Sequence, residues 1–152
     1  MNSDVDIKQV HVKGVYMIET LGRHAPAILL EDNTGILMPI YIGHSEAFSI
    51  NAVLKNETMP RPMTHDLVVS MLTRLSAEIE SVLIDDKIDN IYYARLSLKK
   101  NDSVIEFDAR PSDCIALALR NGAPIMIRDK VLRNAAIEKE KLVGARAIDG
   151  LV

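Results

Sequence analysis

Residues 103–127 read SVIEFDARPSDCIALALRNGAPIMI and contain one complete strand–helix–strand unit. The first seven of these residues are rich in β-branched and aromatic side chains, which favour a strand. Pro111-Ser112 is typical of a helix start and Asn121-Gly122 of a helix end. Residues 114–119 are all apolar, so we expect a helix over residues 113–120 that lies in the core. The side chains expected to face the core are those of Ile115, Leu117, Ala118 and Leu119.

The segments before this unit predict further strands of an antiparallel meander. Strands are expected at 78–85, 91–98 and 103–109, and the turns between them are short and polar. In the middle strand one face carries Tyr92, Ala94, Leu96 and Leu98.

The remaining elements are predicted from periodicity and turn residues. Gly14 indicates a bulge or a bend in the first strand, and Pro39 indicates that the third strand lies at a sheet edge or carries a bulge there. Further strands are expected at 10–18, 27–30, 36–42 and 124–127, and further helices at 45–54, 66–75 and 130–137. The expected N-caps are Ser45, Thr64 and Ser112, and the inward face of the second helix is expected to carry Leu67, Met71, Leu72 and Leu75.

This order of elements predicts an α+β fold, with mixed or antiparallel strands and three to four helices. Residues 45–50 and 112–117 share one pattern: Ser, acid, small, apolar, small, aliphatic. Each follows a predicted strand, which suggests pseudo-duplicated strand–cap–helix units. We expect one domain over residues 1–140 and a short C-terminal tail over residues 141–152.

Composition excludes several classes of protein. The chain has 152 residues, 48% of them hydrophobic and 26% charged, which is typical of one globular domain. No apolar run reaches the roughly 18 residues of a membrane-spanning helix. The net charge of −3 argues against a protein that coats nucleic acid by bulk charge. The single cysteine, Cys114, cannot form an internal disulfide, so we expect a cytoplasmic protein.

A first candidate site surrounds Arg110, which is flanked by Asp108 and Asp113 at the junction of a strand and a helix. A helix N-terminus binds anions and an arginine fork matches phosphate, so this junction is a candidate phosphate or carboxylate site. In the alternative, Ser112 and Asp113 only cap the helix and Arg110 only pairs with Asp108.

A second candidate site is the stiff loop Pro60-Arg61-Pro62, followed by His65 and Asp66. Histidine exchanges protons near neutral pH, so His65 is a candidate general acid or base, and Asp66 could orient it or hold a divalent cation. Alternatively, Asp66 serves the helix dipole and His65 is an ordinary surface residue. Glu46 is a candidate base or metal ligand, or it serves the dipole of its own helix.

Three ordered segments carry a family resemblance: PIYIGHSEA at 39–47, PRPMTHDL at 60–67 and FDARPSDCIALALRNGAPI at 107–125. The chain resembles the bifunctional nuclease domain family of small prokaryotic and plant proteins over roughly residues 10–137. Tyr41 and Cys114 stand where the family usually has Trp and Ala. The resemblance implies an α+β fold with a duplicated core and cleavage of both RNA and DNA, an activity ascribed to plant members. The family blocks fall on Glu46, Arg61, His65, Asp108, Arg110, Ser112 and Asp113.

For a nuclease we expect water as the nucleophile, because Ser45 and Ser112 are assigned to helix caps and Cys114 to an apolar helix. The phosphate would be bound by Arg61, Arg110 and Ser112. The catalytic groups would be His65, Glu46, Asp108 and Asp113. The last three could also hold Mg²⁺ or Mn²⁺.

This site requires Arg61 to approach residues 108–113 in space. The alternative function is a non-enzymatic oligomeric module that binds a small anion or a protein partner through the same groups. In either case we expect a homodimer or another homo-oligomer.

Overall fold

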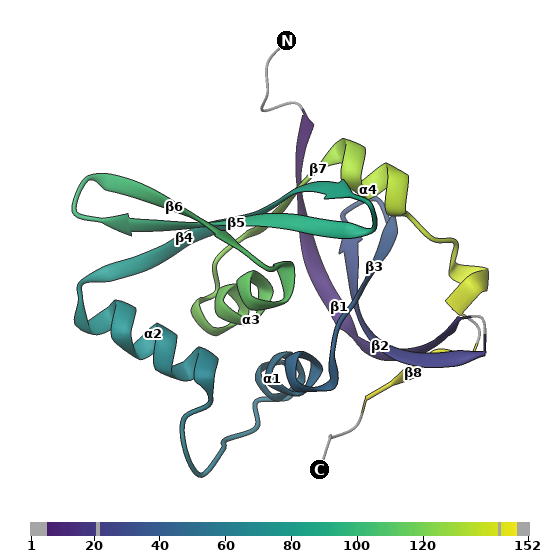
Figure 1. Ribbon diagram of the computed structural model, residues 1–152, viewed down its shortest axis with the longest axis horizontal. Coiled ribbons are helices and arrows are strands. Elements are labelled where there is room, and N and C mark those ends of the chain that lie inside the picture. The colour runs from purple at the N-terminus through teal and green to yellow at the C-terminus, as the bar shows by residue number, and fades with distance from the viewer. Residues whose placement is uncertain (1–5, 21, 143, 149–152) are drawn as a thin grey trace.

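The computed structural model describes residues 6–20, 22–142 and 144–148. These residues form one eight-stranded mixed sheet with four α-helices, so the predicted α+β class is confirmed (Figure 1). The strands are β1 (Ile7–Thr20), β2 (Arg23–Asp32), β3 (Leu37–Tyr41), β4 (Ala77–Ile88), β5 (Ile91–Lys100), β6 (Ser103–Ala109), β7 (Ile125–Arg128) and β8 (Arg146–Ala147). The helices are α1 (His44–Leu54), α2 (Thr64–Arg74), α3 (Pro111–Asn121), α4 (Asp129–Ala135) and the 3₁₀ helix η2 (Lys139–Leu142).

The sheet has the strand order β3-β2-β1-β7-β4-β5-β6, and β8 pairs with β1 outside this path. Neighbouring strands are antiparallel except for β4 and β7, which are parallel. The sheet bends, and α1 and α3 lie in its concavity (Figure 1). The predicted meander is confirmed as β4-β5-β6.

Local sequence signals in the N-terminal strands are confirmed. The β1–β2 register shifts between Val12 and Gly14, which is the predicted bulge. A Cβ atom at Gly14 would lie only 2.9 Å from the ring of Tyr16, so a side chain there would require this ring to move. Pro39 lies in β3 at the edge of the sheet, where a missing backbone N–H is tolerated.

Helix α3 forms the centre of the core, as predicted. Cys114, Ile115, Ala116 and Ala118 are fully buried and Leu117 is 5% exposed, whereas Leu119 is half-buried. The helix ends at Gly122, whose φ of 65° is left-handed and suits glycine.

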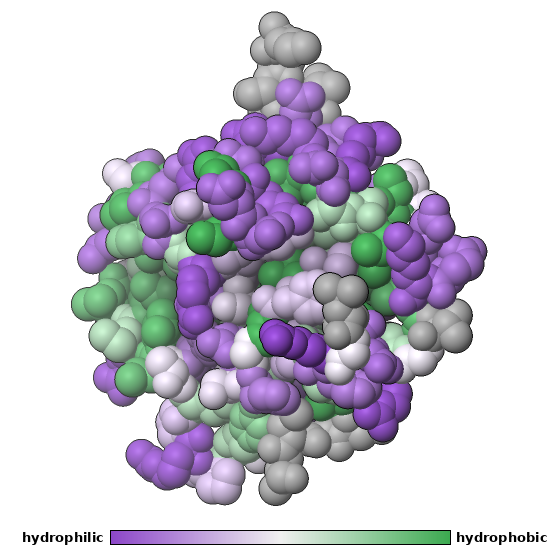
Figure 2. Space-filling model, turned by 45° about the vertical axis from the view of Figure 1, so that its right-hand side comes forward, coloured by the Kyte–Doolittle hydropathy of each residue, from purple (hydrophilic) through white to green (hydrophobic). Residues whose placement is uncertain are grey.

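The predicted inward face of α2 is wrong at three of its four residues. Leu67, Met71 and Leu75 are 54%, 53% and 60% exposed, and of the four predicted residues only Leu72 packs against the core, together with Val68 and Val69. The reason is that α2 has apolar side chains on two sides, and its contacts with α3 and β4 select one of them. Apolar side chains gather at the left of the view in Figure 2. The exposed large apolar side chains of the molecule include Leu67 and Met71 of α2 and Val104, Ile105 and Phe107 of β6.

The predicted N-caps are also wrong. The helices begin one or two residues earlier, so that the N-caps of α1, α2 and α3 are Gly43, Met63 and Arg110. None of the three donates or accepts a side-chain capping hydrogen bond. At α2 the carboxylate of Asp66 accepts the Met63 N–H at 2.8 Å and takes over this function.

The C-terminal residues are packed as far as Ile148. Strand β8 pairs with β1, and the Ile148 N–H donates to the Val15 carbonyl at 3.0 Å. The Ile148 side chain is buried in the core. The predicted tail over residues 141–152 is therefore described only in part, and residues 149–152 lie outside the described residues. None of the described helices is long and apolar enough to cross a membrane.

Candidate functional site

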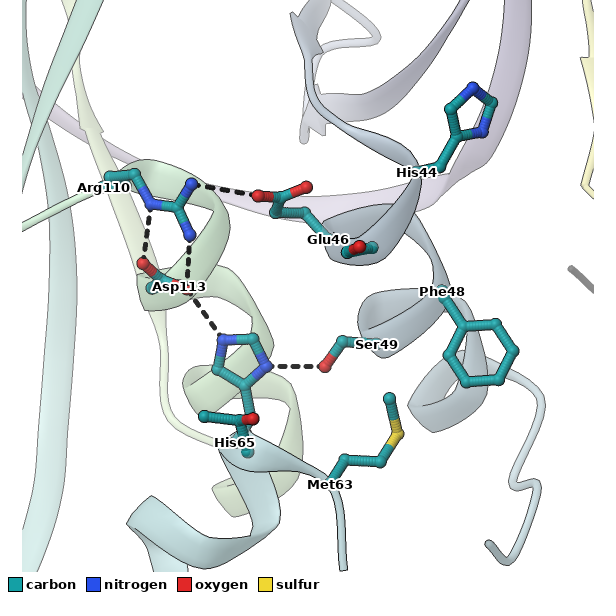
Figure 3. A pocket seen from close by; sticks show the side chains of 10 residues that line it. His44, Glu46, Phe48, Ser49, Met63, His65, Arg110 and Asp113 are labelled. Carbon is teal, nitrogen blue, oxygen red and sulfur yellow. Dashed lines mark hydrogen bonds and ion pairs between the residues drawn. The ribbon is translucent and has the colours of Figure 1, made fainter.

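A cavity of about 600 Å³ lies where the N-terminal ends of three helices meet (Figure 3). Its wall contains residues 44–46 of α1, residues 63–65 at the start of α2, and Arg110 and Asp113 of α3. The N-terminal end of a helix carries unpaired N–H groups and a partial positive charge. The convergence of three such ends favours a negatively charged ligand.

The two segments with the shared sequence pattern hold equivalent places around this cavity. Strand β3 leads into α1 and strand β6 leads into α3, and these strands are the two edges of the sheet. Helices α1 and α3 pack against each other. The predicted strand–helix duplication therefore brings both helix starts to one cavity.

Arg110 connects two carboxylates at the cavity mouth. Its Nε and Nη2 donate to the Asp113 carboxylate at 2.9 and 3.2 Å, and its Nη1 donates to Glu46 Oε1 at 3.0 Å. Both carboxylates raise the pKa of Arg110, the hydrogen-bonded Asp113 most. The pKa of Glu46 is lowered, first by its own backbone N–H and then by Arg110.

A hydrogen-bonded series Ser49–His65–Asp113 crosses the cavity wall. Ser49 Oγ lies 2.6 Å from His65 Nδ1, and His65 Nε2 lies 2.8 Å from Asp113 Oδ1. Burial raises the pKa of Asp113, but hydrogen bonds from Arg110 and His65 outweigh it and leave the pKa below its usual value. The Asp113 carboxylate thus stays ionised at neutral pH and acts as a hydrogen-bond acceptor.

Arg120 fixes the start of α2 against α1 and α3. Its Nε donates to Asp66 Oδ1 at 2.7 Å, and its Nη2 donates to the Ser49 carbonyl at 3.3 Å. Only 7% of the Arg120 side chain is exposed. This contact holds His65, the residue before Asp66, in its position beside Ser49.

Comparison with known proteins identifies the family at this point. The family model described as Bifunctional nuclease domain matches residues 27–140. The chain belongs to the bifunctional nuclease domain family.

Proteins of similar sequence support this family assignment. An uncharacterized protein of Mycobacterium tuberculosis is 35% identical over 130 residues, which cover 85% of this chain and 76% of that protein. Bifunctional nuclease 1 of Arabidopsis thaliana is 32% identical over 136 residues, which cover 84% of this chain and 42% of that protein. Bifunctional nuclease 1 of Oryza sativa subsp. japonica is 30% identical over 118 residues, which cover 76% of this chain and 36% of that protein. The chain therefore spans about two fifths of these plant relatives.

The family blocks meet in space, but not through all the predicted residues. The structure brings Glu46, His65, Arg110 and Asp113 together. The approach of the second block to residues 108–113 is made by His65 and not by Arg61. Arg61 is exposed in the loop before α2, outside the cavity wall, and makes no hydrogen bond or ion pair within the described part of the chain.

Asp108 and Ser112 lie outside the wall of this cavity. Asp108 is exposed on β6 and lines a separate hollow beside Glu106, and Arg110 does not pair with it as the alternative had predicted. Ser112 is buried and lines a neighbouring hollow on the other side of Arg110.

The predicted metal ligands do not form a preformed ion site. The guanidinium of Arg110 lies between Glu46 and Asp113, and Asp108 is apart from both. Among the residues that the structure describes, no group of three or more His, Cys, Asp or Glu side chains could hold a metal ion. The carboxylates present therefore do not fit a three-ligand Mg²⁺ or Mn²⁺ centre.

Ser49 is a residue of the cavity wall that no sequence motif indicates. It is 3% exposed and lies within an apolar stretch of α1, between Phe48 and Ile50. A buried serine needs a hydrogen-bond partner, so a serine within an apolar stretch of a helix indicates a polar contact in the core. The partner, His65, is 16 positions away and could not be read from local sequence.

Proposed function

We propose that the protein is a nuclease that hydrolyses phosphodiester bonds in RNA and DNA. The plant relatives are named bifunctional nucleases. The observation that carries the proposal is a single cavity with two features. Arg110 and three helix N-termini can bind an anion there, and a hydrogen-bonded histidine, His65, lies in the same wall. Phosphodiester cleavage needs both charge stabilisation and proton transfer.

The phosphate would bind to Arg110 and the helix N-termini. A guanidinium has five N–H groups, and the contacts with Asp113 and Glu46 use three of them. The two that remain belong to Nη1 and Nη2, and the side chain is 64% exposed at the cavity mouth. Glu46 then acts by holding Arg110 in place, in contrast to the predicted role as a base.

His65 would move the proton. The carboxylate of Asp113 can only accept a hydrogen bond, so it holds the imidazole with hydrogen on Nε2 and leaves Nδ1 as the basic nitrogen. Asp113 is therefore a positioning residue for His65. The position of Asp108 supports no contact with a substrate in this cavity, and the roles predicted for Arg61 and Ser112 as phosphate-binding residues stay predictions.

The test is nuclease activity of highly purified protein on single- and double-stranded DNA and RNA. We expect Arg110→Ala and His65→Gln each to lower kcat/KM about 100-fold or more, because charge stabilisation and proton transfer are each worth at least this much. Arg74→Ala and His24→Gln are the matched controls, since both side chains are exposed away from the cavity. Equal activity in all five preparations would identify a contaminating nuclease and refute the proposal.

The same assay run with EDTA tests the predicted Mg²⁺ or Mn²⁺ requirement. Complete loss of activity in EDTA, restored by either metal, would support it. Undiminished activity in EDTA would show that the side chains act without a divalent ion.

The second candidate function is the non-enzymatic oligomeric module. Two observations favour it: Glu46 and Asp113 neutralise Arg110, and exposed apolar side chains lie on α2 and β6. It predicts no turnover of RNA or DNA and a molar mass above that of one chain in light scattering. The homo-oligomer and the cytoplasmic location stay predictions under both functions.

A further inference from the structure

Both ring nitrogens of His65 are occupied, and this restricts how the residue can act. Nε2 lies 2.8 Å from the Asp113 carboxylate and Nδ1 lies 2.6 Å from Ser49 Oγ. Because the carboxylate accepts the Nε2 hydrogen, Nδ1 of the neutral imidazole carries a lone pair and accepts the Ser49 hydroxyl hydrogen. The first proton within reach of this base is therefore that of Ser49, not that of a water molecule.

A serine, a histidine and an aspartate joined in this way form the arrangement that activates a serine nucleophile. In the best-known examples Nε2 of the histidine faces the serine and Nδ1 faces the aspartate, whereas here Nδ1 faces Ser49 and Nε2 faces Asp113. The role of each nitrogen depends on its hydrogen bond and not on its place in the ring. Ser49 and His65 both line the cavity that holds Arg110 (Figure 3). The hydroxyl oxygen of Ser49 makes no helix cap, since Ser49 lies in the interior of α1.

We propose that Ser49 Oγ is the nucleophile of the phosphodiester cleavage, in place of the direct attack by water predicted from the sequence. This inference rests on the proposed nuclease function. Ser45 and Ser112 are not the N-caps that the sequence predicted, and the serine in contact with His65 is Ser49.

The reaction would take two balanced steps. Ser49 Oγ forms a bond to phosphorus while His65 Nδ1 takes its proton; the P–O bond to the leaving nucleoside breaks and the leaving oxygen receives that proton. The product is a phosphodiester between Ser49 and the remaining nucleotide. Water then attacks phosphorus and gives its proton to His65, and Ser49 Oγ leaves with that proton. In both steps the charge that develops on the phosphoryl oxygens faces Arg110.

Diisopropyl fluorophosphate tests the nucleophile without a nucleic acid. An activated serine displaces fluoride and keeps the diisopropylphosphoryl group, which intact-mass and peptide mass spectrometry locate. We expect the label on Ser49 of the wild-type protein and its loss in Ser49→Ala. In His65→Gln we expect labelling to be at least 100-fold slower. Ser45→Ala, on the same helix and in the same cavity wall, is expected to keep the label on Ser49.

Nuclease assays complete the test, with Ser49→Ala expected to lower kcat about 1,000-fold or more. Labelled Ser49 in a protein without nuclease activity would uphold the nucleophile and refute the proposed function. An active nuclease that is not labelled, or that keeps a tenth of its activity in Ser49→Ala, would overturn Ser49 as nucleophile and leave the nuclease function standing. The site of the label is read on wild-type protein, so poor folding of a variant cannot imitate either result.

Discussion

At the scale of single residues, Asp113 determines the state of the cavity. It contacts both the cation Arg110 and the imidazole of His65, and these contacts lower its pKa against the effect of burial. A carboxylate with a lowered pKa keeps its charge down to acid pH. The orientation of His65 is therefore held throughout the neutral range and is lost only as the pH falls through the lowered pKa of Asp113.

Cys114, the next residue, has the opposite behaviour. Burial, and secondarily the carboxylates of Asp113 and Asp108, raise the pKa of its thiol to about 12. At pH 8 only about one thiol in 10⁴ is then ionised, and the side chain is fully buried. We expect no labelling of the native protein by iodoacetamide within an hour at pH 8, and complete labelling in 6 M guanidinium chloride, measured by mass. Rapid labelling of native protein would contradict the assigned environment.

At the scale of elements, the rotation of each helix decides which of its apolar residues are buried. Helix α3 is apolar on nearly all sides and is surrounded by α1, α2, β4 and β5. Helix α2 contacts α3 and β4, and the ion pair between Arg120 and Asp66 fixes the side it presents. Leu117 of α3 is therefore buried, whereas Leu67 of α2 is exposed.

A pair of substitutions tests this difference. Leu117→Asp is expected to unfold the domain, because an unpaired carboxylate in the core costs several kcal/mol. Leu67→Asp introduces the same charge at a position that is 54% exposed, and we expect its free energy of unfolding to change by about 0.5 kcal/mol or less. Circular dichroism and urea denaturation measure both. A folded Leu117→Asp protein would show that α3 is not the centre of the core.

Asp85 connects three strands through two arginines and gives a pH-dependent prediction. Its carboxylate accepts from Arg95 Nη2 of β5 at 2.7 Å and from Arg128 Nε of β7 at 2.6 Å. Burial raises its pKa, but the hydrogen bonds from Arg128 and Arg95 outweigh this and lower it. Because the pKa is lower in the folded than in the unfolded state, Asp85 stabilises the fold above about pH 4 and loses this effect as the pH falls through the folded-state pKa.

We therefore expect Asp85→Asn to lower the free energy of unfolding by about 1–2 kcal/mol at pH 7. The difference from wild type is expected to shrink as the pH falls through the lowered folded-state pKa of Asp85, because the wild-type carboxyl is then protonated too. Urea denaturation at a series of pH values measures this. A difference that stays constant down to the acid limit of the folded state would refute the electrostatic explanation.

At the scale of the whole molecule, the cavity depends on the way one sheet bends. The two edge strands, β3 and β6, lie at opposite ends of the strand order, yet the helices that follow them begin at the same place. The pairing of β1 with β7 and of β7 with β4 joins the two halves of the sheet. Stability of the site is therefore linked to strand pairings far from it.

The C-terminal residues give a prediction at this scale. Truncation after Leu142 removes β8 and the buried side chain of Ile148, and it leaves the buried Asn51 amide without the Ile148 carbonyl, its acceptor at 2.9 Å. We expect a loss of about 3 kcal/mol in the free energy of unfolding, from one buried isoleucine and one unpaired amide. Urea denaturation measures the loss.

Asn51→Ala is the matched control for this truncation. We expect it to cost about 1 kcal/mol in the full chain and less in the truncated chain, where the hydrogen bond is already absent. A truncated protein as stable as the full chain would show that the domain ends before β8.

Most of the secondary structure and several of the site residues could be predicted from the sequence. Strand and helix positions, the bulge at Gly14, the edge position of Pro39 and the buried α3 follow from local backbone and burial preferences, which act over a few residues. The motif blocks also indicated Arg110 and His65 as candidate site residues, because their chemistry depends on residue type and not on the fold.

Which of these groups come into contact depends on the folded chain. His65 lies 48 positions from Asp113 and 16 from Ser49, and Arg61 of the same block lies outside the cavity. Sequence periodicity predicts which residues share one face of a helix. When apolar side chains lie on two sides of the helix, it does not predict which side packs against the core. The side that packs is selected by contacts and ion pairs between distant segments, so the exposed face of α2 could not be predicted from the sequence. The role proposed for Ser49 depends in the same way on a distant partner, His65.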